Sequence, residues 1–171
     1  LTGVHTYLAE LGAVDTRDGS ITNVLFTTFD DKYEVKNGGQ PMPLETARKQ
    51  ITAKDILPRG MTALHDAIGN GLRDTRACIR AATIKPDKVV VFILTDGHEN
   101  SSSIWSSPEV KKEIAKLEAA PYNYAFFFAA AGQDASQTGI RMGLKADDCI
   151  TWSPDRRAAQ ETFRSVSEQT Q

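Results

Sequence analysis

The stretch Lys88-Val-Val-Val-Phe-Ile-Leu-Thr-Asp-Gly97 decides the fold that this sequence predicts. Its apolar residues follow one another without interruption, as they do in strands that are buried on both faces of a parallel sheet. The run then ends in a carboxylate, Asp96, and a glycine. Because open parallel sheets bind their ligands at the carboxyl ends of their strands, Asp96 is the first candidate for a functional residue.

Thr62 is the second candidate. It lies in Pro58-Arg-Gly-Met-Thr-Ala-Leu-His-Asp-Ala-Ile68, a glycine-containing loop that leads directly into a predicted amphipathic helix. Taken singly, a Thr before a helix is more often an N-cap, and an Asp-Gly after a strand is more often a turn. A hydroxyl and a carboxylate on neighbouring loops are, however, oxygen ligands of the kind that Mg²⁺ takes. Their joint occurrence favours a small, open and polar metal site.

The two motifs together resemble the second and third metal-site loops of von Willebrand factor type A domains. Gly60-Met-Thr-Ala-Leu-His-Asp-Ala-Ile68 is similar to the second loop, and Leu94-Thr-Asp-Gly-His-Glu-Asn-Ser-Ser102 is similar to the strand end and the third loop. The similarity extends over nearly the whole chain and is greatest to compact intracellular versions from bacteria and phages.

This resemblance implies a fold and a function. The implied fold is a doubly wound, mostly parallel α/β sheet with helices on both faces. The implied site is a metal-ion-dependent adhesion site, in which Thr62 and Asp96 bind Mg²⁺ or Mn²⁺, with Asp96 often acting through a water. The carboxylate of a partner protein's Asp or Glu then completes the coordination.

The family's first metal loop, Asp-x-Ser-x-Ser, has no match in this sequence. The chain opens instead with Val4, Leu8 and Leu11 at helical spacing, which resembles the latter half of the family's first helix. With no initiator Met and no targeting segment, residues 1–171 are expected to form a single, N-terminally incomplete domain. We expect its central first strand to precede Leu1 or to come from another chain, because unpaired inner sheet edges invite pairing.

Composition narrows the function classes. With 20 basic and 22 acidic residues and no basic run, the chain does not favour nucleic-acid binding. The longest apolar run, at 122–131, suits a buried strand and is too short to cross a bilayer. Cys78 and Cys149 match no zinc or redox spacing, and so sparse a cysteine content favours free thiols in a reducing compartment, the cytoplasm.

The remaining pattern alternates strands with helices, as parallel sheets require. The helix after Thr62 has an apolar stripe of Leu64, Ile68, Leu72, Thr75, Ile79 and Ala82, with Asp66 among the residues that face elsewhere. Further strands are predicted at 23–29, 33–36, 123–130 and 149–152, and further helices at 44–52, from 107, at 134–142 and from 153.

Other polar residues near the two motifs have two interpretations. His98 and Glu99 suit acid/base chemistry but are more often solvated loop residues, and residues 100–103 either tune the rim of the site or solvate it. His65 is expected to orient the loop or to meet solvent rather than to bind metal. Asp30 and Asp31 either support the metal site or form a plain turn, which is the commoner case. The positive N-terminus of the helix after Thr62 favours an anionic group nearby.

The sequence therefore predicts a metal-assisted protein-interaction module rather than an enzyme. It contains no Gly-x-Ser-x-Gly elbow, phosphate-binding loop or dinucleotide fingerprint. Two alternatives stay open: a metal-dependent, phosphate-handling hydrolase that uses Asp96, and a structural scaffold whose metal site has decayed. With Thr62 and Asp96 alone, the chain is expected to hold Mg²⁺ poorly.

Overall fold

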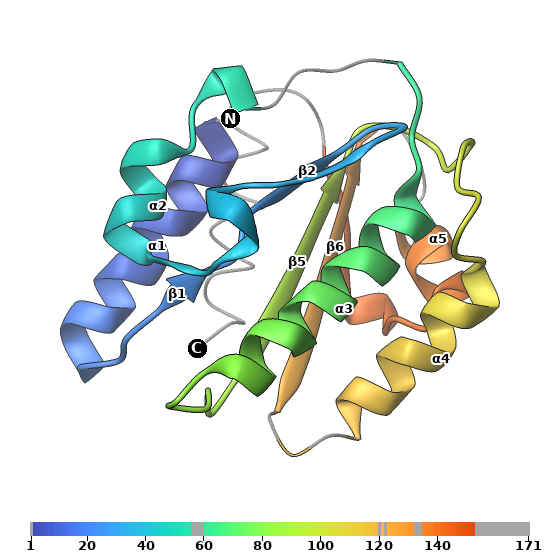
Figure 1. The fold of residues 1–171 in the computed structure, drawn as a ribbon. Helices are drawn as coiled ribbons and strands as arrows, with labels where there is room; N and C mark the ends of the chain where they lie inside the picture. The colour runs from blue at the N-terminus through green and yellow to red at the C-terminus, as the bar shows by residue number, and fades with distance from the viewer. Residues whose placement is uncertain (1, 56–59, 120, 122, 132–134, 153–171) are drawn as a thin grey trace. The chain divides into compact units, whose positions relative to one another are not determined.

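The computed structural model describes residues 2–55, 60–119, 121, 123–131 and 135–152 (Figure 1). The chain divides into two compact units, each assembled from segments that are not consecutive in sequence. The first unit comprises residues 1–28, 34–58 and 153–171, and the second comprises 29–33 and 59–152. The helix predicted from residue 153 lies outside the described residues.

The first unit is built on two helices. The predicted N-terminal helix is α1, Thr2–Asp18, and it packs against α2, Leu44–Gln50. Buried apolar residues of this unit include Tyr7, Leu8, Leu44 and Ala47. The unit also contains short 3-10 turns at Asn37–Gly39 and Ala53–Asp55.

The strand predicted at 23–29 is wrong as a continuous element. Its ends form two separate short strands, β1, Asn23–Val24, and β2, Thr27–Phe29. They diverge because each has a different partner: β1 pairs antiparallel with β4, Met42–Pro43, whereas β2 pairs with β3, Tyr33–Val35, across the turn at Asp30 and Asp31.

The second unit contains the parallel sheet that the apolar run at 88–95 predicts. Its strands are β5, Val89–Thr95, β6, Tyr124–Ala131, and β7, Cys149–Trp152, in that order across the sheet. Both pairings are parallel, with Ile93 opposite Phe128 and Phe128 opposite Cys149. The carboxyl ends of all three strands therefore lie along one edge of the sheet.

Three helices pack on one face of this sheet: α3, Leu64–Ala81, α4, Ser107–Glu118, and α5, Ala135–Arg141 (Figure 1). The predicted stripe of α3 is buried at Leu64, Ile68 and Leu72, as its spacing requires. These residues share a core with others from every second position of β5 and β6, including Val89, Ile93, Tyr124, Phe126 and Phe128. The coarse class is thus α/β, with a helix-flanked three-stranded parallel sheet in the second unit and two short two-stranded pairs elsewhere in the chain.

A capping box begins α4: Ser106 is its N-cap, and the Ser106 side chain and backbone N–H both pair with Glu109. After α5, Gly143 adopts a φ of +94°, which lets the chain turn out of the helix.

Both cysteines are free thiols, in agreement with the sequence analysis. Burial, with a smaller contribution from the neighbouring Asp148 carboxylate, raises the pKa of the Cys149 thiol to about 11. Within the described part of the chain, no helix combines the length and the apolar character that crossing a membrane needs.

Candidate metal site and its supporting loop

Thr62 and Asp96 both lie where β5 ends. Asp96 directly follows the last residue of β5 and is exposed, whereas Thr62 stands two residues before α3 and is half-buried. The Thr62 hydroxyl lies so close over Gly97 that even a Cβ at position 97 would overlap it. The hydroxyl is therefore adjacent to the residue that follows Asp96, as a shared site requires, and glycine at 97 leaves room for it.

Asn100 clamps the two loops together at Thr62. The Thr62 backbone N–H donates to Oδ1 of Asn100 at 2.9 Å, and the Asn100 N–H donates to the Thr62 carbonyl at 3.0 Å. This pair of bonds fixes the backbone at Thr62 relative to the loop after β5. Asn100 is therefore a structural link rather than only a polar rim residue.

Glu99 is the anionic group at the N-terminus of α3, and its interpretation as a solvated loop residue is wrong. Its Oε2 accepts the backbone N–H of His65, in the first turn of the helix, at 3.0 Å. Its Oε1 accepts the N–H groups of Ser101 and Ser102, and Oε2 also accepts the Ser102 hydroxyl at 2.7 Å. The Glu99 carboxylate thus satisfies one backbone N–H in the first turn of α3 that would otherwise lack a partner.

Asp66 lies off the apolar stripe of α3, but it is buried, because the loop after β5 covers it. Its carboxylate accepts three consecutive backbone N–H groups, those of Ser103, Ile104 and Trp105, at 2.7 to 2.9 Å. Its own N–H donates to the Ser102 hydroxyl. The loop folds around Asp66 because this carboxylate accepts the three backbone N–H groups that can no longer form hydrogen bonds with water.

These hydrogen bonds lower the pKa values of Glu99 and Asp66. Burial acts to raise the pKa of Glu99 and of Asp66, but backbone N–H donors outweigh it and hold both below their ordinary values. For Glu99, the main opposing donors are Ser102 and His65. Both groups are accordingly carboxylates at neutral pH.

Asp30 and His65 support the same loops. Asp30 is buried in the hairpin turn, where its carboxylate accepts the Lys32 N–H at 2.7 Å, and its backbone carbonyl accepts the Ala63 N–H, also at 2.7 Å. It is a turn residue, as the commoner interpretation held, and it also holds the residue next to Thr62. The His65 ring lies 3.6 Å from the Glu99 carboxylate, which agrees with a role in orienting the loop. His98 is exposed.

The donors at this edge suit a hard cation in kind but are few in number. Thr62 and Asp96 supply a hydroxyl and a carboxylate oxygen, whereas Glu99 and Asp66 already accept several N–H donors each. The hydroxyl oxygen of Ser101, in the same loop, is buried without a hydrogen-bond partner. In the described ranges, no three His, Cys, Asp or Glu side chains gather as a metal cluster would. The residues therefore fit a cation that keeps most of its waters or takes ligands from elsewhere.

Comparison with known protein families found no family model that matches this chain, and no curated protein matches it.

We predict that Gly69→Ala disturbs the loop while Gly71→Ala does not. A Cβ on Gly69 would overlap the indole ring of Trp105, whereas the nearest atom to a Cβ on Gly71 is the Tyr33 hydroxyl at 3.8 Å. Gly69→Ala should lower the free energy of unfolding by about 1–3 kcal/mol through overpacking. Gly71→Ala, in the same helix, should raise it by about 0.5–1 kcal/mol. Urea unfolding measures both, and equal effects would contradict the packing of Trp105 on Gly69.

We predict that Glu99→Gln weakens folding in a pH-dependent way. Because the pKa of Glu99 is lowered in the folded state, its contribution is present above its ordinary value of 4.5 and is lost as pH falls through the lowered pKa. At pH 7 the variant should lose about 1–3 kcal/mol of unfolding free energy, since charge-assisted bonds are replaced by weaker ones. Below pH 4 the difference from the parent chain should shrink. Urea unfolding at pH 7 and pH 3 checks this, and a constant difference would refute it.

Proposed function

We propose that this chain is a metal-ion-dependent protein-interaction module. Thr62 and Asp96 hold Mg²⁺ or Mn²⁺ at the sheet edge, and the carboxylate of an Asp or Glu from a partner protein completes the coordination. The proposal includes the doubly wound arrangement of von Willebrand factor type A domains as the full fold. The observation that carries it is the position of the Thr62 hydroxyl against Gly97, next to the exposed Asp96.

The division of labour among three acidic residues supports this proposal. Glu99 and Asp66 are occupied by N–H donors from the loop and from α3. Asp96 is exposed, and among the described residues it has no hydrogen-bond or ion-pair partner. A carboxylate that the fold does not use for its own stability is available for a ligand, and a cation is the ligand that its charge attracts.

The rigidity of the loop gives the second support. Metal sites work best when backbone and side-chain bonds hold their ligands in place before the ion arrives. Here the Asn100 clamp, the Glu99 cap and the three bonds to Asp66 tie together the segments that follow Thr62 and Asp96. The loop should therefore lose little conformational entropy when a cation binds.

We predict that the chain alone binds Mg²⁺ weakly. Mg²⁺ requires near-octahedral oxygen coordination and gives up water reluctantly, so two protein oxygens should give a Kd on the order of millimolar or weaker. Isothermal titration calorimetry of the chain with MgCl₂ measures this. A micromolar Kd that disappears in Asp96→Asn would show that further ligands complete the site.

We predict that the chain selects acidic peptides in a metal-dependent manner. A random peptide library panned against the chain in 5 mM Mn²⁺, roughly the concentration that a millimolar site needs, should enrich sequences containing Asp or Glu. Their binding should be lost in chelator, in Asp96→Asn and in Thr62→Val, which removes the hydroxyl at constant shape. Thr62→Ser, which keeps the hydroxyl, should retain binding.

Asp31→Asn is the matched control for this experiment, because Asp31 is an exposed carboxylate in the hairpin turn of the same unit. Binding that survives chelator would favour a scaffold without a working metal site. Hydrolysis of phosphoesters that is lost in Asp96→Ala would replace the proposal with the hydrolase alternative.

A further inference from the structure

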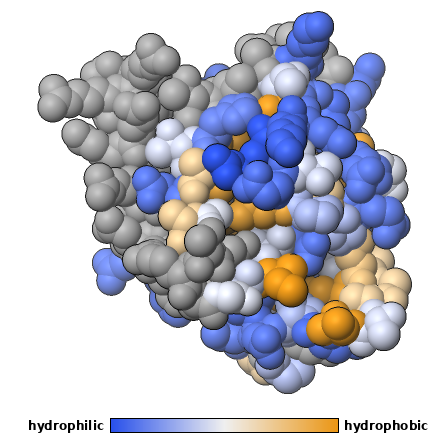
Figure 2. All heavy atoms as spheres, turned by 90° about the vertical axis from the view of Figure 1, so that its left-hand side faces the viewer, coloured by the Kyte–Doolittle hydropathy of each residue, from blue (hydrophilic) through white to orange (hydrophobic). Residues whose placement is uncertain are grey.

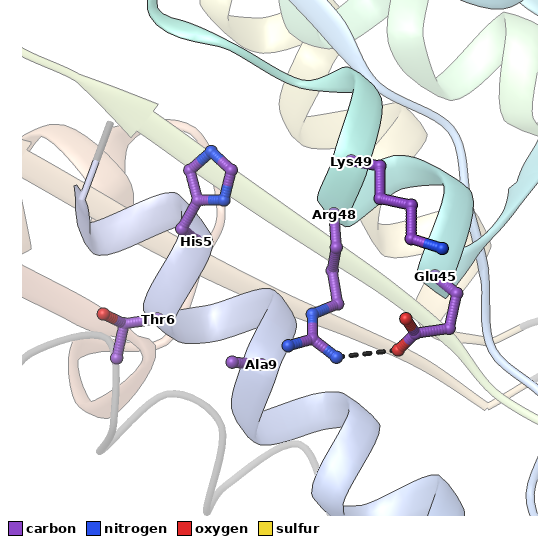
Figure 3. Close-up of a pocket in the computed structure, with 6 residues that line it drawn as sticks. All are labelled: His5, Thr6, Ala9, Glu45, Arg48 and Lys49. Atoms are coloured by element: carbon purple, nitrogen blue, oxygen red, sulfur yellow. Dashed lines mark hydrogen bonds and ion pairs between the residues drawn. The ribbon is translucent and has the colours of Figure 1, made fainter.

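A hollow of about 480 Å³ lies between α1 and α2 in the first unit and shares no residue with the candidate metal site. His5, Thr6 and Ala9 of α1 line it, together with Glu45, Arg48 and Lys49 of α2 (Figure 3). The hollow is wide open to solvent, so it suits a small polar group rather than a ligand that must be enclosed. Figure 2 shows strongly hydrophilic side chains gathered on the face of the molecule that carries these helices.

Small residues on α1 make room for the hollow and for Arg48. A Cβ on Gly12 would lie 3.4 Å from Nη1 of Arg48 and 3.8 Å from Oε1 of Glu45, so the guanidinium rests close to the α1 backbone. Figure 3 shows the Arg48 side chain reaching from α2 toward α1, with its guanidinium between Ala9 and the Glu45 carboxylate. Arg48 is half-buried, whereas Glu45 and Lys49 are exposed.

Most hydrogen-bond donors at this hollow are unused. Of the five N–H groups of Arg48, one donates to Oε1 of Glu45 at 2.7 Å. Among the described residues, Arg48 has no other side-chain partner, and the side chains of His5 and Lys49 have none. A neutral imidazole still offers one N–H, so His5 adds a donor in either protonation state.

The charge balance favours an anion. The lining side chains include two cations, Arg48 and Lys49, and one carboxylate, Glu45, which leaves an excess of positive charge at the hollow. The Arg48 guanidinium, the Lys49 ammonium and the His5 imidazole approach the hollow from different sides (Figure 3), which suits a tetrahedral dianion, because its oxygens accept bonds from several directions. We infer that this hollow binds the phosphate group of a phosphate monoester through Arg48, Lys49 and His5, with Glu45 competing for Arg48.

Nuclear magnetic resonance titration of the ¹⁵N-labelled full chain tests this inference, with inorganic phosphate as the first probe. Phosphate should shift the backbone amides of residues 5–9 and 45–49 saturably, whereas sodium chloride at matched ionic strength should not. Arg48→Gln should weaken binding about tenfold, because it removes charge-assisted bonds. Lys49→Gln should weaken it by a smaller factor, and Glu45→Gln should strengthen it by freeing Arg48.

Arg73→Gln is the matched control. Arg73 is exposed, belongs to the second unit and also pairs with a neighbouring carboxylate, that of Asp74, but it does not line the hollow. Its removal should leave the phosphate affinity unchanged. Because the Arg48–Glu45 pair is solvent-exposed, Arg48→Gln should fold normally, and circular dichroism checks this.

Phenyl phosphate and a neutral peptide carrying one phosphoserine then separate two sources of the same group. Equal affinities would place recognition in the phosphate alone, and a tighter peptide would identify phosphorylated protein as the source. Both results support the site. Shifts no larger than those with chloride, or equal affinities for Arg48→Gln and Arg73→Gln, would overturn it.

Discussion

Two buried or half-buried carboxylates hold the loop after β5 on the first turn of α3. Glu99 accepts N–H donors from His65, Ser101 and Ser102, and Asp66 accepts them from Ser103, Ile104 and Trp105. Each bond joins a charged acceptor to a backbone donor, which makes it stronger than a bond between neutral groups. The positions of Thr62 and Asp96 depend on this arrangement, because both residues lie on the segments that it ties together.

The loop after β5 and the first turn of α3 together carry carboxylates of two kinds: Glu99 and Asp66 stabilise the fold, and Asp96 is exposed and free to bind a ligand. Burying a carboxylate costs stability unless donors satisfy it, and Glu99 and Asp66 meet that condition. Asp96 lies at the start of the loop and stays exposed, so it needs no such partners. Its exposure is what makes it the best candidate for a ligand to a cation, while the hydroxyl of Thr62 beside Gly97 supplies a second oxygen.

The sequence predicted the elements that bury an uninterrupted or periodic apolar surface. The run at 88–95 became β5 in a parallel sheet, and the stripe from Leu64 became the buried face of α3. The prediction at 23–29 was wrong because a short strand takes its length from its partners, and two different partners divide it into β1 and β2. The burial of Asp66 was not predicted, because its N–H donors come from a loop that no helical periodicity includes.

The sequence by itself determined the strand and helix that frame the candidate site, because hydrophobic spacing is a local property of the chain. It also brought Thr62 and Asp96 forward as candidate ligands, through the polar loops that follow and precede those elements. Only the tertiary structure decided the roles of Glu99 and Asp66, whose donors at His65 and Ser103 lie 34 and 37 residues away. A carboxylate in a polar loop carries the same local signal whether it meets solvent or caps a helix, and only the packing of the loop on α3 distinguishes the two.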